Sequence, residues 1–339
     1  MTLRIGLAGC GWISKFHIEG WKLVPNVEIV AGCDRDPSRA RDLASRYGIP
    51  WAGEDATLMM DECRLDILDI ATTPDSHKAL ALLAAERGVH VLCQKPAALT
   101  LADAEEMIRC ADEHRVALYI NEMMRFCPWF QKTHQLLQKN SVGRVIFARL
   151  FSRMAGFLKV GPSHKVIYGP REFLKRADRA IMLDETIHYL DVIRYFFGNP
   201  KSIYAIIEHL SPLLNGEDVA TIMLRYEGMT AVIEDSWSAH GPNRSGLEIE
   251  GLEGAVFLSH CKVLELYSGQ RGGIEGTWNY SGTSWDEQRP AVFASLFKDF
   301  LKVISSESDL TTQAHDNMET LRLTLAAYES AEAGTEVKL

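Results

Sequence analysis

Along the first third of the chain, short apolar runs alternate with longer segments in which apolar residues recur at helical spacing. The apolar runs predict strands that begin at Leu3 and continue with Val27–Cys33, Asp66–Thr72, Val89–Cys93 and Val116–Ile120. The helical segments are Ile13–Val24, Pro74–Arg87 and Thr100–Arg115. Strands joined by helices of this length predict a parallel, doubly wound sheet of the α/β class.

From about Asn121 the pattern changes to strands separated by short turns. The predicted strands are Val145–Arg153, Ser202–Glu208, Val219–Tyr226, Thr230–Ser236, Gly246–Glu250, Ala255–Ser259 and Val263–Tyr267. Three helices are predicted in this part, at Leu183–Phe197, Ala291–Ile304 and His315–Ala331. This pattern predicts an α+β domain with a large, mostly antiparallel, open sheet. We therefore expect two domains, residues 1–122 and 123–339.

The first strand runs directly into a glycine turn, in the sequence L-R-I-G-L-A-G-C-G-W-I-S from Leu3 to Ser14. Gly9 and Gly11 precede the first predicted helix, whose N-terminal N–H groups and dipole can hold a pyrophosphate. Ser14 stands where the usual fingerprint has its third glycine, and glycine pairs also form ordinary turns. On this turn alone, a dinucleotide site and a simple bend are both open.

Asp34 follows the second predicted strand about 20 residues after the glycines, where a carboxylate can accept hydrogen bonds from an adenosine ribose. A turn or helix-cap acid before Pro37 is the simpler interpretation of Asp34, and it is compatible with binding. Together with the glycine turn, Asp34 predicts a dinucleotide-binding Rossmann domain. Its carboxylate repels a ribose 2′-phosphate and favours NAD, whereas Arg35 and Arg39 could pair with that phosphate and keep NADP open.

Ligands of a parallel sheet bind beyond the carboxyl ends of its strands. We expect the cofactor to contact the residues at these ends, which are Gly9, Gly11, Trp12, Ile13, Asp34, Arg35, Thr72, Thr73, Pro74, His77, Gln94 and Lys95. Lys95 follows a strand and precedes Pro96, so its ammonium group could reach a substrate oxygen near the nicotinamide. An ordinary surface lysine is the alternative.

Asp184 and His188, in D-E-T-I-H, are four residues apart on a predicted helix, which places them on one face. The carboxylate could orient the imidazole and stabilise its protonated form, so His188 is a candidate base for an alcohol proton. A structural ion pair is the alternative. Asp191 lies one turn further and would allow a metal site, but we predict no metal because Lys95 and His188 already supply the charge.

Composition narrows the class of protein. The 339 residues are 47% hydrophobic and 24% charged, as in a globular protein of about two domains. The formal net charge of −9 argues against nucleic acid as a partner. We expect no membrane association, because no secretory signal is visible and no apolar run approaches the roughly 18 residues that cross a bilayer. Seven cysteines without C-x-x-C spacing predict free thiols in a reducing cytoplasm.

A basic connection interrupts this acidic chain between Lys159 and Arg179. It could line the mouth of a substrate site or receive an anionic group. A solvated surface loop is the alternative.

Together these motifs resemble the Gfo/Idh/MocA oxidoreductase family, and the resemblance covers nearly the whole chain. The matching segments are A-G-C-G-W-I-S at the start, A-T-T-P-D-S-H at residues 71–77, C-Q-K-P at 93–96, D-E-T-I-H-Y-L-D at 184–191, E-G-L-E-G-A-V-F-L and A-Y-E-S-A-E-A-G. The family usually has Glu-Lys-Pro where this chain has Gln94, Lys95 and Pro96, which puts in question how the lysine and the nicotinamide ribose are held. The resemblance also implies a cis Lys95–Pro96 bond.

The resemblance implies that Lys95, Asp184 and His188 are the catalytic lysine, aspartate and histidine. It also implies that Asn121 and Arg125 bind substrate and belong to the segment that enters the substrate domain. It implies NAD(P)-dependent oxidation of a sugar or polyol hydroxyl. The sequence is also loosely similar to sugar dehydrogenases of the apiose dehydrogenase type. A homodimer or homotetramer formed through the open sheet face is also implied. The alternative is a catalytically silent, dinucleotide-binding regulator of the same fold.

Overall fold

The computed structural model describes residues 2–154, 172–239, 241–282, 284–306 and 309–339. Contacts divide the chain into two compact units. The first comprises Met1–Phe126 and Trp285–Leu321, and the second comprises Cys127–Ser284 and Arg322–Leu339. The expected boundary after residue 122 lies close to the end of the first segment, but residues 285–321 pack with the first unit.

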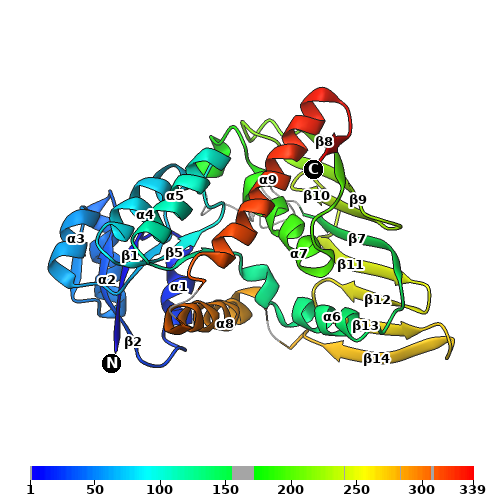
Figure 1. Ribbon diagram of the computed structural model, residues 1–339, viewed down its shortest axis with the longest axis horizontal. Helices are drawn as coiled ribbons and strands as arrows, with labels where there is room; N and C mark the ends of the chain where they lie inside the picture. The colour runs from blue at the N-terminus through cyan, green and yellow to red at the C-terminus, as the bar shows by residue number, and fades with distance from the viewer. Residues whose placement is uncertain (1, 155–171, 240, 283, 307–308) are drawn as a thin grey trace. The chain divides into compact units, whose positions relative to one another are not determined.

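The first unit is built on a six-stranded sheet in which every neighbouring pair of strands is parallel (Figure 1). Its strands are β1 (Leu3–Ala8), β2 (Val27–Cys33), β3 (Trp51–Gly53), β4 (Ile67–Ile70), β5 (His90–Gln94) and β6 (Leu118–Asn121). Their spatial order is β3-β2-β1-β4-β5-β6, so the direction of winding reverses between β1 and β4. Ligands of such sheets bind at this reversal, beyond the carboxyl ends of the strands.

Helices complete the first unit. They are α1 (Ser14–Trp21), α2 (Pro37–Tyr47), α3 (Ala56–Cys63), η1 (Pro74–Ser76), α4 (His77–Ala85), α5 (Leu101–Glu113), η2 (Met123–Phe126), α8 (Trp285–Ser306) and the first part of α9 (Thr312–Ala333). Strand β4 is buried along its whole length, and β1 over its last four residues. Burial on both faces explains why these strands appear in the sequence as continuous apolar runs. The predicted doubly wound parallel sheet is confirmed.

Helices α2 and α3 and the short strand β3 were not predicted. In α2 only Ala40, Leu43 and Ala44 are buried, so its apolar stripe is narrow. The sequence signal for α2 and α3 lay in their N-cap residues. Asp36 accepts the Ser38 N–H at the start of α2, and Asp55 accepts the Thr57 and Leu58 N–H groups at the start of α3.

The second unit carries a nine-stranded sheet, in the order β14-β13-β12-β11-β7-β10-β9-β8-β15. Its strands are β7 (Val145–Arg153), β8 (Ser202–Glu208), β9 (Val219–Arg225), β10 (Thr230–Ser236), β11 (Arg244–Gly251), β12 (Gly254–Ser259), β13 (Val263–Ser268), β14 (Gly273–Asn279) and β15 (Val337–Lys338). Neighbours are antiparallel except for β7 and β10, which pair in parallel at the centre. The predicted mostly antiparallel sheet is confirmed; β14 and β15 were not predicted.

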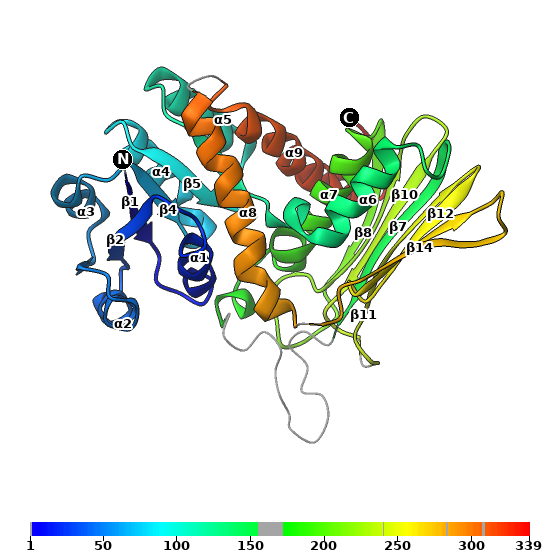
Figure 2. The same ribbon diagram turned by 90° about the horizontal axis from the view of Figure 1, so that it is seen from below.

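One face of this sheet is covered and the other is open. The unit contains α6 (Pro128–Gln138), η3 (Glu172–Lys175), the π-helical turn η4 (Met182–Thr186), α7 (Ile187–Phe197) and the end of α9. Figure 2 shows α6 and α7 on the same side of the sheet. Along β8, buried Ile203 and Ala205 alternate with exposed Tyr204 and Ile206, as a strand with one covered face requires.

Among the helices in the described part of the chain, none combines the length and the apolar character that crossing a membrane requires.

Candidate active site

Gly9 and Gly11 meet different requirements in the turn after β1. Gly9 has a φ of +96°, and a Cβ there would lie 2.6 Å from the carbonyl oxygen of Ala71, directly after β4. Gly11 has no positive φ, and a Cβ added to it would meet nothing within 4 Å. The close approach of the two strand ends therefore requires Gly9. At Gly11 the turn leaves open space beside the N-terminus of α1, which fits a pyrophosphate.

Ser14, in place of the third glycine, is completely buried. Its hydroxyl donates a hydrogen bond to the carbonyl oxygen of Gly11 at 2.6 Å. The serine therefore stabilises the turn from inside the first turn of α1.

Asp34 holds the end of β2 against the glycine turn. One carboxylate oxygen accepts the Cys10 N–H at 2.8 Å, and the other accepts the Asp36 N–H at 2.9 Å. The helix-cap role that was the alternative for Asp34 belongs to Asp36, because Asp36 accepts the Ser38 N–H. Each Asp34 oxygen has a second lone pair, so the carboxylate retains capacity for ribose hydroxyls.

The residues after β4 and β5 are joined through His77. This histidine is completely buried, and its Nδ1 lies 2.9 Å from the Pro96 carbonyl oxygen. Its Nε2 lies 3.2 Å from the Thr72 carbonyl oxygen. Burial lowers the pKa of His77. A neutral imidazole has a single N–H donor, so the ring donates to one of these two carbonyl oxygens. Thr73 and Pro74 lie half-buried between the bridged segments.

Trp12, Ile13 and Arg35 complete the predicted cofactor set. The Trp12 ring is half-buried, meets the Phe16 ring edge-on at 5.1 Å and has the Arg289 guanidinium 4.9 Å above it. Ile13 packs against the core cluster around Leu7. Arg35 is exposed just after β2, at the position from which a side chain can extend past a ribose.

Lys95 directly follows β5, and the Lys95–Pro96 bond is cis, as the resemblance implied. Gln94 pairs with Asn121 at the ends of β5 and β6. Asn121 is 1% exposed, and its side-chain nitrogen lies 3.2 Å from His17 Nε2. Arg125, in η2, forms an ion pair with Asp316 at 2.7 Å.

In the second unit, Asp184 lies in the π-helical turn η4 and His188 in the first turn of α7. Asp184 is half-buried, and His188 is 8% exposed. The spacing argument assumed an α-helix throughout, so its angle per residue does not hold across η4. Single π-helical turns are frequent at functional sites, because they move side chains out of the regular α-helical register.

Glu217 fixes the start of this helical segment from the loop between β8 and β9. The same carboxylate oxygen, Oε1, accepts the Ala180 N–H at 2.9 Å, the Met182 N–H at 3.3 Å and the Tyr328 hydroxyl at 2.6 Å. The Glu217 main-chain oxygen accepts the Ile181 N–H at 3.1 Å. Glu217 is 7% exposed, so these bonds form away from water. It therefore acts as a remote N-cap for the segment that carries Asp184.

Two further carboxyl groups hold η4 against the sheet. Glu185 accepts hydrogen bonds from the Trp237 indole at 2.5 Å and the Tyr189 hydroxyl at 2.8 Å. Asp235, on β10 and 2% exposed, accepts the Thr186 hydroxyl at 2.8 Å. Burial, and after it the charge of Glu185, raises the pKa of Asp235 well above its usual range. The turn that carries Asp184 is thus held by Glu217 at its start and by Asp235 and Trp237 at the end of β10.

The predicted residues fall into two groups. The cofactor set, Lys95, Asn121 and Arg125 lie in the first unit, whereas Asp184 and His188 lie in the second. Lys159, Lys165 and Arg171 of the basic connection lie outside the described residues. Within the described ranges, no group of three or more His, Cys, Asp and Glu side chains has the arrangement of a metal site.

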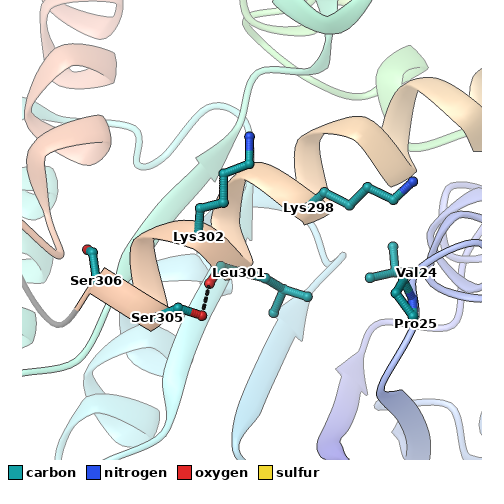
Figure 3. Close-up of a pocket in the computed structure, with 7 residues that line it drawn as sticks. All are labelled: Val24, Pro25, Lys298, Leu301, Lys302, Ser305 and Ser306. Atoms are coloured by element: carbon teal, nitrogen blue, oxygen red, sulfur yellow. Dashed lines mark hydrogen bonds between the residues drawn. The ribbon is translucent and has the colours of Figure 1, made fainter.

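A cavity of about 460 Å³ lies elsewhere on the first unit, between the turn at Val24 and Pro25 and helix α8 (Figure 3). Figure 3 shows Lys298 and Lys302 leaving α8 in different directions. The Ser305 hydroxyl beside them donates to the Leu301 carbonyl oxygen at 2.8 Å. The cavity contains none of the predicted site residues, and its polar groups do not converge.

Two family models match the sequence. One, described as an oxidoreductase family with an NAD-binding Rossmann fold, matches residues 3–122, and the other, described as a GFO/IDH/MocA C-terminal domain, matches residues 130–257. A D-apiose dehydrogenase of Paraburkholderia graminis is 32% identical over 98% of this chain and 88% of that protein. The chain belongs to the Gfo/Idh/MocA oxidoreductase family.

Further relatives are similar to this chain along nearly its whole length. A myo-inositol 2-dehydrogenase of Thermotoga maritima is 26% identical over 99% of this chain and 98% of that protein. The crystal structure of an oxidoreductase from Agrobacterium radiobacter in complex with NAD⁺, L-tartaric acid and magnesium gives a TM-score of 0.88 at 29% identity, covering 100% and 98% of the two chains. The predicted family, NAD cofactor and oxidoreductase activity are thereby confirmed.

Several buried polar residues near the candidate site residues were not predicted. They are His17, Asp69, Glu217 and Asp235. Asp69 is a charged residue inside the apolar run D-I-L-D-I-A-T, and His17 stands among buried residues of α1. A polar residue at a core position was the available signal, because such a group needs a partner. The sequence did not indicate which partner.

Proposed function

We propose that this enzyme oxidises a secondary or hemiacetal hydroxyl of a sugar or polyol, with Lys95, Asp184 and His188 as its catalytic residues. Relatives named D-apiose dehydrogenase and myo-inositol 2-dehydrogenase support this class of substrate. The position of Lys95 carries the proposal. It directly follows β5, at the sheet edge where the glycine turn leaves space for a dinucleotide.

The first unit fits NAD through three features. Open space beside Gly11 meets the N-terminus of α1, Asp34 can accept from ribose hydroxyls, and Thr72, Thr73 and Pro74 lie at the reversal point of the sheet. The carboxylate of Asp34 favours NAD over NADP. When bound, NAD supplies the acceptor for the hydride that leaves the substrate carbon.

In the proposed reaction, His188 takes the proton of the substrate hydroxyl, and the carboxylate of Asp184 stabilises the imidazolium that forms. The ammonium group of Lys95 stabilises the negative charge that develops on the substrate oxygen. The C–H bond breaks as the C=O bond forms, and the proton on His188 passes to solvent. We further propose that Asn121 and Arg125 contribute to substrate binding.

We propose that the enzyme forms a homodimer or homotetramer through the open face of the second sheet. Exposed Tyr204 on β8 stands opposite Met223 on β9, and Met223 stands opposite Val232 on β10, so an apolar row crosses three strands. Ile206, 48% exposed, lies next to this row. An exposed apolar row of this kind is typical of an interface between protein chains. The seven free cysteines support a cytoplasmic location.

Turnover of Lys95→Ala and His188→Ala tests the catalytic assignment. Each change should lower turnover at least about 100-fold, the scale of acid–base and charge-stabilising groups, while NADH still binds. NADH absorbance is followed with a panel that includes D-apiose and myo-inositol, and NADH binding is measured by fluorescence. Lys298→Ala and His114→Ala are matched controls. Lys298 lines a cavity that contains none of the proposed site residues, and His114 ends α5, at the opposite edge of the first sheet from the carboxyl ends of its strands.

Three outcomes separate the alternatives. Loss of turnover in both site variants, with normal controls, supports the assignment. Near-normal turnover in both site variants rules it out. Tight NADH binding by the unchanged enzyme without turnover on any sugar or polyol favours a regulatory protein of the same fold.

A further inference from the structure

Four polar side chains converge below the carboxyl edge of the first sheet. His17 comes from α1, Asp69 from β4, Gln94 from the end of β5 and Asn121 from the end of β6. His17 and Asp69 are completely buried, and Gln94 and Asn121 are 8% and 1% exposed. Each of them therefore depends on a protein partner for its hydrogen bonds.

The contacts of His17 connect these side chains in a row. Its Nδ1 lies 2.9 Å from both oxygens of Asp69, and its Nε2 lies 2.8 Å from the amide nitrogen of Gln94. The Trp21 indole also donates to Asp69, at 2.8 Å. Asp69 thus receives two N–H groups, from His17 Nδ1 and from Trp21, as an ionised carboxylate can.

The orientation of the Gln94 amide fixes the tautomer of His17. The Gln94 side-chain oxygen accepts the Lys95 N–H at 3.2 Å, and a backbone N–H can only donate. The NH₂ group of Gln94 must therefore face His17, whose Nε2 accepts its proton. His17 consequently carries its proton on Nδ1, is neutral, and connects Asp69 to the residue that precedes Lys95.

We propose that His17 is a positioning residue that, held by Asp69, acts through Gln94 to fix the turn from which Lys95 reaches the substrate. This inference rests on the catalytic role proposed above for Lys95. It also explains what glutamine does at position 94. An ionised carboxylate there could only accept hydrogen bonds, so it would require a doubly protonated His17. With Gln94, the Lys95 turn is held without a second proton on the imidazole.

The Asn121 amide nitrogen lies 3.2 Å from the same His17 Nε2, but it is Gln94 that also accepts the Lys95 N–H. Asp69 faces His17 from β4, the neutral amides of Gln94 and Asn121 face it from β5 and β6, and the rings of Phe293 and Phe297 from α8 lie 4.7 and 5.7 Å from its ring. Among these groups Asp69 is the charged one. A second carboxylate would therefore change the protonation of His17 directly.

The test compares Gln94→Glu and Gln94→Leu with the unchanged enzyme at saturating NAD. Gln94→Leu keeps the volume and loses both hydrogen bonds, so kcat should fall at least about 10-fold through misplacement of Lys95. In Gln94→Glu, the new carboxyl group and His17 Nε2 share one proton. When that proton is lost at higher pH, a carboxylate faces a lone pair on His17. The ratio of its kcat to that of the unchanged enzyme should therefore fall as the pH rises.

Gln138→Glu is the matched control, because Gln138 lies 3.4 Å from His134 on the exposed side of α6. It makes the same chemical change beside a solvated histidine, and its kcat ratio should not change with pH. If Gln94→Glu gives the same flat ratio while Lys95→Ala is inactive, the positioning role is wrong and the catalytic assignment stands. If Lys95→Ala is active, the catalytic assignment itself is wrong, and the inference that rests on it is withdrawn.

A second measurement needs no substrate. The nitrogen resonances of ¹⁵N-labelled histidine, assigned to His17 by their loss in His17→Gln, report which ring nitrogen carries a proton. We expect a proton on Nδ1 alone in the unchanged enzyme at neutral pH, and protons on both nitrogens in Gln94→Glu. A doubly protonated His17 in the unchanged enzyme, or the same protonation in both proteins, would overturn the inference.

Discussion

Gly9→Ala should destabilise the first unit by about 2–5 kcal/mol. A φ of +96° lies in the left-handed region, where a residue with a Cβ loses about 1–2 kcal/mol. The added Cβ would also lie 2.6 Å from the oxygen and 2.7 Å from the carbon of the Ala71 carbonyl. These are backbone atoms at the end of a buried strand, so the overlap is relieved only by moving β1 or β4, at a cost of about 1–3 kcal/mol.

Gly11→Ala should have the opposite effect on stability, although Gly11 is only two residues away. Its φ is not in the left-handed region, and the new methyl group would meet no atom within 4 Å. A glycine replaced by alanine without strain stabilises a protein by about 0.4–1 kcal/mol, because the unfolded chain loses freedom. The same methyl group fills the space proposed for the pyrophosphate. A steric overlap that costs about 1.4 kcal/mol of binding free energy there weakens NADH binding about 10-fold.

Thermal unfolding followed by circular dichroism, combined with a fluorescence titration with NADH, measures both effects. The midpoint should fall by about 2–4 °C for each kcal/mol lost in a unit of this size. Gly48→Ala is the control for φ alone, since Gly48 has a φ of +72° and open space around its Cβ, and it ends α2. It should lose less stability than Gly9→Ala and keep its NADH affinity. Earlier unfolding of Gly11→Ala than of Gly9→Ala, or normal NADH binding by Gly11→Ala, would contradict these roles of the two glycines.

Three further predictions concern the second unit. Glu217→Ala removes the acceptor of the Ala180 and Met182 N–H groups. It should therefore lower the midpoint of unfolding and reduce kcat more than NADH affinity. Equal losses of kcat and of NADH affinity would contradict the role of Glu217 in holding the η4 segment. Because the pKa of Asp235 is raised, its contribution to stability is present at acid pH and is lost as the pH rises. The stability of Asp235→Asn relative to the unchanged enzyme should therefore increase with pH. A pH-independent difference in stability would refute this. Met223→Glu should shift the proposed oligomer toward monomers in sedimentation velocity, whereas Leu252→Glu, on an exposed turn, should not.

The sequence was sufficient for five of the six strands of the first sheet, because these strands are largely buried, whereas the short strand β3 is only half-buried. The glycine turn was predicted because it has a local cause. The requirement at Gly9 arises from one φ angle and one close contact, and both belong to the known geometry of such turns. Asp34 was found by its distance from the glycines along the chain. Its bond to the Cys10 N–H shows that the same carboxylate also holds the turn in place.

The parallel pairing of β7 with β10 could not be predicted. A strand with one covered face alternates apolar and polar residues in the same way whether its neighbour is parallel or antiparallel. The chain between these two strands contains α7, β8 and β9, so no hairpin turn fixes their register. Only the packing of the whole sheet decides this pairing, which places Glu234 beside Phe151 and Asp235 beside Ser152.

The spacing of Asp184 and His188 illustrates a different limit. Four residues place two side chains on one face only if the helix is α-helical throughout, and Met182–Thr186 is π-helical. The bonds that hold this turn come from Glu217, Asp235 and Trp237, which are remote in the sequence. Residue types and spacing therefore indicated the candidate catalytic groups but not the geometry in which they are held.

The two departures from the expected motifs have the same physical explanation. Ser14 replaces a glycine, and its buried hydroxyl donates to the Gly11 carbonyl oxygen inside the turn. Gln94 replaces an acid, and its buried amide donates to His17 and accepts from the Lys95 N–H. In both cases a neutral side chain satisfies a neighbouring backbone group without adding charge. At both positions the substituted side chain has its own hydrogen-bond partners, so the departure from the motif does not leave a buried polar side chain unsatisfied.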